Sequence, residues 1–418
     1  MGFMTKTSAT GRHGRRPSRS ARSARRPVGL PTAEPRVLLV SASIGEGHNA
    51  AAAAFAAAIR QLRPGCEIRE VDTFTQRGET FVRGAYQAAV QLTPPMQQLW
   101  YWVVERLAIM RWFYREVVGR RVARTLRPHV ADFQPDVVVS TYPLATAGLS
   151  WLRRRGLLDA PVLAVLCDFA PHAFWIYPHV TRYFVLSEHA QRVMDTLAPA
   201  VPVTVCATPV PRSFTPPSAR ESTAARERYG IPPDALAVLV SGGAFGLGSV
   251  TAAVDAALAA PRTQVIVVCG RNERLRAALH QRHGNNDRLR VFGWVEDMGE
   301  LMAGVDVVVN NAGGMTATEA LARGRALVMF RPIAGHGRAC ASAMAQTGLA
   351  VVGTRRGWLA KQLTRWVERP ELLRAGQARA AQHARAHHMS EAAALVLNHA
   401  VNGAAADTGE SRVGEQAS

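Results

Sequence analysis

The chain has 418 residues, enough for two ordinary domains with full hydrophobic cores, and 48% of them are hydrophobic, which excludes a largely disordered protein. The formal net charge of +19 predicts an anionic partner, and nucleic acid, acidic lipid and phosphorylated substrates are all candidates. Residues 1–30 contain eight Lys or Arg and no acidic residue. No apolar run reaches the roughly 20 residues of a membrane-spanning helix, so we expect any membrane role to be peripheral.

Two kinds of segment that would change the cellular setting are not expected. The basic N-terminus is not followed by an apolar stretch, so it does not resemble a secretory signal. The five cysteines form no Cys-x-x-Cys pair, and we expect buried, reduced thiols in a cytoplasmic protein; they are Cys66, Cys167, Cys206, Cys269 and Cys340.

Short β-branched runs alternate with alanine-rich stretches along most of the chain, which predicts an α/β protein with parallel sheets. The clearest predicted strands are Val37–Val40, Val137–Ser140, Val162–Leu166, Tyr183–Leu186, Leu236–Val240, Val265–Val268 and Val305–Val309. The proline-rich segment Thr208–Pro217 interrupts the alternation. We therefore predict a disordered basic tail (1–34), an N-terminal domain (35–212), a linker (213–230), a C-terminal domain (231–402) and a disordered C-terminal tail (403–418).

The first predicted strand ends in a glycine turn that leads into a helix of alanines. Gly45 and Gly47 allow backbone and ligand to approach closely, and the helix N-terminus favours negative charge. His48 lies in the first helical turn, toward the crevice at the carboxyl end of the sheet. A neutral imidazole there can take a proton from an attacking hydroxyl, although a helix-capping role explains the spacing equally well.

Two glycine-rich turns of the second domain also follow predicted strands and lead into helices. One contains Gly242, Gly243, Phe245 and Gly246, and the other contains Gly313, Gly314 and Thr316. Such turns suit phosphate groups, although the first lacks the Gly-Lys-Ser/Thr ending of a P-loop and a tight structural turn explains it as well. Glu319, in the following helix, can accept hydrogen bonds from a ribose diol or simply complement the helix dipole.

An acid, a histidine and a tryptophan gather after the third predicted strand and indicate a further part of the site: Asp168, His172 and Trp175. Asp168 and His172 are suitable metal ligands, but no neighbouring residue completes the set. The sequence therefore predicts no metal.

Aromatic and basic residues alternate over residues 81–127, a pattern typical of a helix on an anionic membrane surface. The residues predicted to contact the membrane are Trp100, Trp102, Arg106, Arg111 and Trp112. The alternative is a helix whose aromatic side chains fill the core and whose arginines are merely solvated.

Eight motifs, spread over about residues 36–400, occur in the order found in the monogalactosyldiacylglycerol synthase family, which the chain resembles. They are Gly45-x-Gly47-His48, Ser140-Thr141-Tyr142-Pro143, Asp168-Phe169-x-x-His172-x-x-Trp175, Tyr183-Phe184-Val185-x-Ser187-Glu188, Gly242-Gly243-x-Phe245-Gly246, Val268-Cys269-Gly270-Arg271-Asn272, Gly293-Trp294-Val295-x-Asp297-Met298 and Gly313-Gly314-x-Thr316-x-Thr318-Glu319-Ala320-Leu321. The second half also resembles the UDP-N-acetylglucosamine transferase that makes the peptidoglycan lipid precursor.

The resemblance implies a GT-B fold, in which two Rossmann-like domains face a cleft, and inversion at the anomeric carbon. It implies a lipid acceptor in the N-terminal domain with His48 as base, and a UDP-sugar donor in the C-terminal domain with Glu319 on the ribose. Arg271, Trp294 and Val295 join the glycine turns as predicted nucleotide-binding residues. No cofactor is expected, because backbone amides and helix dipoles can stabilise the departing diphosphate.

The segment after Gly335 departs from the family, which usually carries Gln or Glu side chains against the donor sugar. This sugar loop reads His336, Gly337 and Arg338. The leading hypothesis is an inverting hexosyltransferase that makes a diacylglycerol-type glycolipid at the inner face of the plasma membrane, with no specific nucleic-acid partner. The alternatives are a sugar-nucleotide epimerase of the same fold and a non-catalytic nucleotide-binding protein.

Overall fold

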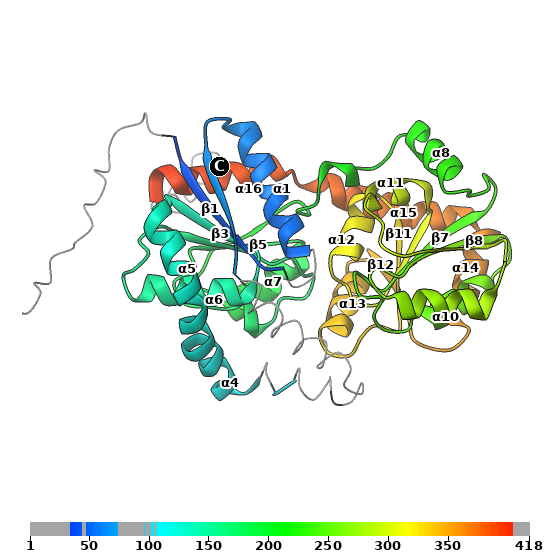
Figure 1. Ribbon diagram of the computed structural model, residues 1–418, viewed down its shortest axis with the longest axis horizontal. Helices are drawn as coiled ribbons and strands as arrows, with labels where there is room; N and C mark the ends of the chain where they lie inside the picture. Colours follow the sequence, from blue (N-terminus) through cyan, green and yellow to red (C-terminus); the bar gives the residue numbers. More distant parts are fainter. Residues whose placement is uncertain (1–33, 44–46, 74–95, 97–101, 104–105, 404–418) are drawn as a thin grey trace, which may run out of the picture. The chain divides into compact units, whose positions relative to one another are not determined.

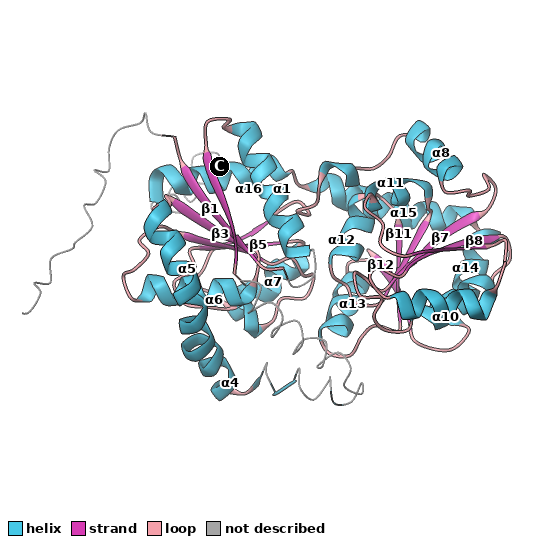
Figure 2. Ribbon diagram, in the orientation of Figure 1, coloured by secondary structure: helices cyan, strands magenta, loops and turns pink. Residues whose placement is uncertain are grey.

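The computed structural model describes residues 34–43, 47–73, 96, 102–103 and 106–403. Apart from Glu34 and Gly403, both predicted tails lie outside these residues, as do two predicted site residues, Gly45 and Trp100. The described chain contains two parallel six-stranded sheets covered by helices on both faces (Figure 2). The predicted α/β class is therefore confirmed.

The first sheet is built by the N-terminal half of the chain. In spatial order its strands are β2 (Glu67–Asp72), β1 (Arg36–Ser41), β3 (Val137–Ser140), β4 (Val162–Val165), β5 (Arg182–Val185) and β6 (Val203–Val205). Alternate side chains of β1 face opposite layers, as the pleat of a strand requires. Val37 and Leu39 pack with α1 (Gly47–Leu62), whereas Leu38 and Val40 pack with α5 (Gly119–Phe133) and α6 (Pro143–Arg154).

Two helical segments of this half are notable: the C-terminal helix packs on it, and a π-helical segment interrupts one of its helices. The last helix of the chain, α16 (Met389–Asn402), packs against α1, and its Ala393 and Val396 are fully buried (Figure 1). On the other face, α4 (Ala108–Phe113) continues through a π-helical segment, Tyr114–Val118, into α5. Of the stretch 81–127 in which a helix is predicted, residues 81–95, 97–101 and 104–105 lie outside the described residues, and the chain is helical from 108 to 133.

The second sheet is built by the C-terminal half. Its strands, in spatial order, are β12 (Ala350–Gly353), β11 (Ala326–Phe330), β10 (Val307–Asn310), β7 (Leu236–Ser241), β8 (Thr263–Val268) and β9 (Leu289–Phe292). One face is covered by α11 (Met298–Gly304), α12 (Met315–Ala322), α13 (His336–Gln346) and α15 (Pro370–Ala386). The other face is covered by α9 (Val250–Leu258), α10 (Glu273–His283) and α14 (Trp358–Glu368).

All seven predicted strands are present, with ends shifted by at most two residues. Five further strands occur in the described residues, and four of them, β2, β6, β9 and β12, are the edges of the two sheets. An edge strand is partly solvated, so its sequence mixes polar and apolar residues, as the Glu67–Asp72 segment does, and lacks the apolar run that identifies a central strand.

Each sheet contains one place where the connections change direction. In the first sheet β1 lies between β2 and β3, and in the second β7 lies between β8 and β10. From such a strand the chain first adds strands on one side of it and later returns to add strands on its other side. Because the helices that leave and return lie on opposite faces, a crevice opens between the two strand ends at this point, and ligands of α/β proteins bind there.

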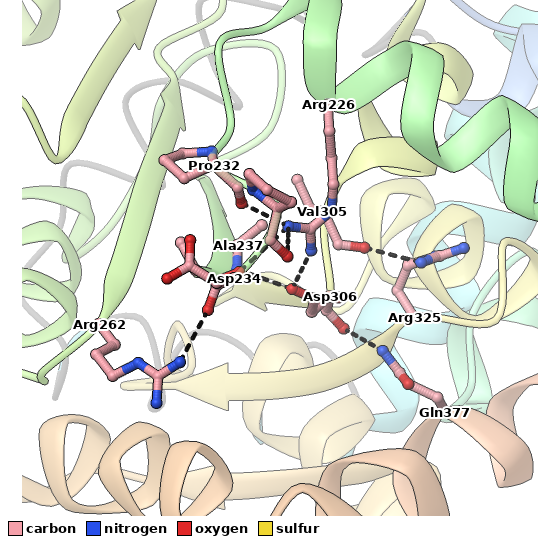
Figure 3. A network of polar contacts seen from close by, with 11 residues as sticks. Arg226, Pro232, Asp234, Ala237, Arg262, Val305, Asp306, Arg325 and Gln377 are labelled. Atoms are coloured by element: carbon pink, nitrogen blue, oxygen red, sulfur yellow. Dashed lines mark hydrogen bonds and ion pairs between the residues drawn. The ribbon is translucent and has the colours of Figure 1, made fainter.

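At the amino-terminal ends of the strands of the second sheet, opposite the crevice, a network of hydrogen bonds joins the surrounding segments (Figure 3). Asp306 precedes β10, and its Oδ2 accepts from the Ala237 amide at 2.8 Å and from Arg226 Nη2 at 2.6 Å. Arg226, in α8 (Ala219–Arg228), also donates to the carbonyl of Pro232 at 2.9 Å, and Gln377 donates to the carbonyl of Asp306 at 3.2 Å. One carboxylate thus joins α8 to two central strands.

We expect Asp306→Asn to lower the free energy of unfolding by about 1–3 kcal/mol, because it weakens two charge-assisted bonds to partly buried donors. Urea unfolding of the full chain measures this loss. The control is Asp132→Asn, since Asp132 pairs with Arg69 but its side chain is 74% exposed, so we expect a much smaller loss. Equal losses in the two variants would contradict the structural role of Asp306.

Candidate active site

His48 lies at the crevice of the first sheet, where the chain leaves β1 and where β3 ends. Its Nδ1 is 2.6 Å from the carbonyl oxygen of Thr141, and the Thr141 hydroxyl donates to the carbonyl of His48 at 2.9 Å. The ring also meets Tyr142 edge to face, with the centroids 5.0 Å apart. Because a carbonyl only accepts, Nδ1 carries the proton and Nε2 carries the lone pair of the neutral ring.

Burial lowers the pKa of His48, and the nearby Asp168 carboxylate and the bond to Thr141 only partly oppose this effect. The ring is therefore neutral near pH 7. A neutral histidine of fixed tautomer, at the carboxyl edge of a sheet, has the properties required of a general base.

The first glycine turn of the second half follows β7 and is held to both neighbouring loops. Gly243 and Gly246 have φ values of 73° and 57°, and the Gly246 amide bonds to the Gly243 carbonyl at 3.0 Å. The Arg271 amide after β8 donates to the carbonyl of Ala244 at 2.8 Å. Asn311 after β10 donates to the carbonyl of Leu247 at 2.7 Å. Three loops are thereby fixed around the crevice of this sheet.

A cation–aromatic pair lies at the ends of β8 and β9. The Arg271 guanidinium is 4.4 Å from the centre of the Trp294 ring, and Trp294 is 46% exposed. Val295 packs, partly buried, against the core. The pair leaves a flat aromatic face and a positive charge accessible at this edge.

The second glycine turn follows β10 and is organised by an asparagine that sequence reasoning missed. Asn310 Oδ1 accepts from the amides of Ala312 and Gly313, both at 2.9 Å, and Gly313 has a φ of 73°. Gly314 caps α12, and Thr316 lies in its first turn. The repeated Asn310-Asn311 at a strand end is the sequence signal that could have indicated this role.

Glu319 lies one turn into α12 and is partly buried. Burial raises the pKa of its carboxyl to about 7, and no hydrogen bond or ion pair to this carboxyl is found in the described part of the chain. A buried carboxyl that lacks a protein partner is suited to accept hydrogen bonds from a ligand.

Residues of the two halves meet beside these crevices. Gly47, at the start of α1, faces Met315, at the start of α12, so closely that a Cβ atom at position 47 would overlap the Met315 side chain. Asp168, after β4, forms an ion pair with His336, the first residue of α13, with Oδ1 and Nε2 3.1 Å apart. No sequence motif indicates either contact.

A compact polar cluster surrounds this ion pair. Burial alone would raise the pKa of Asp168, but attraction to His336 holds it well below its usual range; burial disfavours the charge on His336, but Asp168 raises its pKa well above the ordinary value. Burial lowers the pKa of His172 to about 3, and its ring centre is 5.3 Å from that of His336. Cys340 Sγ is 3.3 Å from His336 Nε2.

The remaining predicted site residues occupy different surroundings. Trp175 is fully buried and anchors the loop that carries Asp168 and His172 rather than facing a ligand. Gly337 lies in α13, and a Cβ atom added there would be 3.1 Å from the Asn311 carbonyl oxygen. The Arg338 amide bonds to the Ile333 carbonyl at 3.0 Å. The sugar loop therefore adjoins the β10 turn through its backbone.

The predicted membrane-contact residues that the structure describes lie on or beside α4. Trp102 is 44% exposed and Trp112 is 55% exposed, and the Arg106 guanidinium lies over the Trp102 ring at 5.7 Å. Other apolar side chains are exposed on the same segment: Leu107, Ile109, Phe113 and Val117. The described helices include none that is both long and apolar enough to cross a membrane.

Known families match both halves of the chain. The family model described as monogalactosyldiacylglycerol (MGDG) synthase matches residues 48–204, and the model described as glycosyl transferases group 1 matches residues 246–369. Among solved structures, the chain is similar to Acinetobacter baumannii MurG, with a TM-score of 0.55, 19% identity and coverage of 87% of this chain and 99% of that one. It is also similar to SnogD from Streptomyces nogalater, with a TM-score of 0.59, 17% identity and coverage of 88% and 100%.

The fold and these matches define a glycosyltransferase of the GT-B fold and confirm the predicted resemblance to the MGDG synthase family. Among curated proteins, the chain is similar to the processive diacylglycerol beta-glucosyltransferase of Bacillus mycoides (strain KBAB4). The two are 29% identical over 330 residues, which cover 76% of this chain and 82% of that protein. The corresponding protein of Bacillus cereus (strain AH187) matches to the same extent.

Proposed function

We propose that this protein transfers a hexose from a UDP-sugar to the hydroxyl of a diacylglycerol-type lipid, with inversion at the anomeric carbon. The observation that carries the proposal is His48, a neutral histidine of fixed tautomer at the crevice of the sheet that the MGDG synthase model matches. The names of the Bacillus relatives support the lipid acceptor and the hexose.

The proposed chemistry is one displacement. The lipid hydroxyl oxygen attacks the anomeric carbon as His48 Nε2 takes its proton, and the bond to the diphosphate oxygen breaks on the opposite side. The proton that Nδ1 donates to Thr141 keeps the ring in the productive tautomer, and the same carbonyl stabilises the imidazolium that forms.

The proposed donor site lies at the crevice of the second sheet. Amides of the two glycine turns and the start of α12 supply positive potential for the diphosphate, so the displacement needs no cofactor. Glu319 accepts from the ribose hydroxyls, and the exposed Trp294 face, backed by Arg271, is suited to stack on the uracil ring.

The lipid acceptor requires that the protein reach a membrane. We assign this contact to α4 and the residues before it, where exposed Trp102, Ile109 and Trp112 lie beside exposed arginines. Four exposed arginines continue the basic surface along α5: Arg120, Arg121, Arg124 and Arg127. Apolar and cationic groups on one helix are suited to the interface of an anionic leaflet.

Incubating the full chain with a panel of radiolabelled UDP-sugars and diacylglycerol-containing vesicles tests the function. A labelled glycolipid with β configuration, which inverts the α-linked donor, is the expected product. Conversion of UDP-N-acetylglucosamine to an epimer without acceptor, or UDP binding without any product, would instead favour the epimerase or the non-catalytic protein.

We expect Glu319→Gln to have opposite effects on UDP affinity and on stability. It removes a charged acceptor worth roughly 1.5–3 kcal/mol, so UDP affinity falls about 10- to 150-fold. In the free protein the carboxyl pKa is raised to about 7 from 4.5, so its contribution to stability is present below pH 4.5 and lost as the pH rises through 7. The variant is therefore more stable than the parent at pH 8, by up to about 3 kcal/mol. At pH 5 its gain in stability over the parent is smaller.

Calorimetry with UDP and urea unfolding at both pH values measure the two effects. Glu368→Gln, at the exposed end of α14, is the matched control and should change neither quantity. Unchanged UDP affinity in folded Glu319→Gln would remove Glu319 from the donor site.

We expect His48→Ala to lower turnover by about 10²–10⁴-fold while leaving UDP affinity nearly intact, because the base acts only on the acceptor. Since the pKa of His48 is lowered, turnover should rise with pH along a limb centred below 6.5. Thr141→Val, which removes the hydroxyl bond to the His48 carbonyl but keeps the imidazole, is the control and should lose far less. A stable His48→Ala variant with most of its turnover would exclude His48 as the base.

Replacing Trp100, Trp102 and Trp112 by Ala should abolish sedimentation with anionic vesicles, because apolar anchors are lost in addition to charge contacts worth about 1 kcal/mol each. Val401→Ala, on α16, removes a 66% exposed apolar side chain elsewhere and should bind like the parent. If the triple variant still sediments and deletion of residues 1–30 prevents it, the docking surface lies in the tail.

A further inference from the structure

Three side chains with metal-ligating atoms converge where the loop after β4 meets the start of α13. Asp168, His172 and His336 each offer one ligand atom, and these atoms lie within 4.8 Å of one another. They come from three separate backbone positions: the loop after β4, the residue before the 3₁₀ turn Ala173–Trp175, and the first residue of α13. The sequence predicts no metal here because the third ligand, His336, lies 164 residues beyond His172.

The spacing fits a small metal ion. Two ligands on a tetrahedral Zn²⁺, with bonds of about 2.0–2.2 Å, lie roughly 3.3 Å apart. Asp168 Oδ1 and His336 Nε2 are 3.1 Å apart, and the His172 ring lies against that of His336 at 5.3 Å. An ion can therefore replace the proton between Asp168 and His336, and a rotation of the His172 side chain brings in a third ligand.

The backbone that carries the ligands is held by buried contacts. The Tyr183 hydroxyl, in β5, donates to the carbonyl of Trp175 at 3.3 Å and accepts from the Tyr177 amide at 3.1 Å, which fixes the loop after His172. At the other side, the Ile333 amide bonds to the Asn311 carbonyl at 2.8 Å and positions the start of α13. Ligands on a fixed backbone lose little entropy on binding an ion.

The ligand types select the kind of ion. Two imidazoles and one carboxylate suit Zn²⁺ and its neighbours Co²⁺ and Ni²⁺, whereas Mg²⁺ requires oxygen ligands in octahedral geometry. The Asp168 and His336 side chains are 19% and 31% exposed, so an ion can enter from solvent. Three protein ligands leave a fourth position for water or a substrate oxygen, as in catalytic zinc sites.

We propose that Asp168, His172 and His336 bind one divalent transition-metal ion of the zinc type, which joins the loop after β4 to the start of α13. The ion is additional to the proposed displacement and carries none of its steps. The His48 ring is close enough to Asp168 and His336 to interact with both electrostatically. An oxygen ligand at the fourth position of the ion would come from water.

Zinc titration of the full-length, untagged chain by calorimetry tests the site, with Co²⁺ absorption as a second probe of coordination. We expect one ion per chain, a four-coordinate cobalt spectrum and no competition from a thousandfold excess of Mg²⁺. His172→Ala and His336→Gln should each weaken zinc binding by at least about 100-fold. Asp168→Asn, which changes little volume, provides a third variant if either of these fails to fold by circular dichroism.

The matched control is His387→Ala. His387 Nε2 pairs with Glu188 at 3.3 Å, as His336 pairs with Asp168, but this pair is not part of the three-ligand cluster. The control should bind zinc like the parent. Absence of stoichiometric binding, or equal binding by the ligand variants and the control, would overturn the proposal. Neither sugar nor lipid is present, so the result is independent of the proposed transfer reaction.

Discussion

The reversal of strand order in each parallel sheet is the constraint on which the candidate site depends. Helices that leave toward opposite sides cannot close over the same strand ends, so a crevice opens between β1 and β3 and another between β7 and β10. His48 and Thr141 meet at the first crevice, and the turns at Gly243 and Gly313 meet at the second. Glycosyl transfer needs an acceptor and a donor site, and this fold provides one crevice for each.

Polar groups have different surroundings at the two ends of the strands of the second sheet. At the amino-terminal ends of the strands, Asp306 Oδ2 accepts from Arg226 and from the Ala237 amide, and the Asp306 carbonyl accepts from Gln377. At the carboxyl ends, Glu319 is partly buried with a raised pKa, and Trp294 is exposed. Stability is concentrated where the chain enters the strands, whereas the strand ends keep groups whose partners must come from outside.

The sugar loop is held in contact with the N-terminal half by the cluster of Asp168, His172 and His336. His336 contributes to a cluster that spans both halves, and its charge and that of Asp168 depend on each other. Cys340, one helical turn later, adds a sulfur beside the same imidazole nitrogen. The sugar loop thus contributes a titratable group to a cluster close to His48.

The sequence by itself determined the class of fold, most of the central strands (β11, Ala326–Phe330, is the exception) and the local chemistry of each turn. Buried parallel strands require continuous β-branched runs, and turns beside a ligand require glycine. Both features can be recognised from residues that are adjacent in the sequence. It did not identify the edge strands, because partial solvation removes the apolar run from segments such as Glu67–Asp72. Only the tertiary structure decided that Asp168 meets His336, that Gly47 faces Met315 and that Glu319 is partly buried with a raised pKa, since these depend on how distant helices pack and leave no periodic trace along the chain.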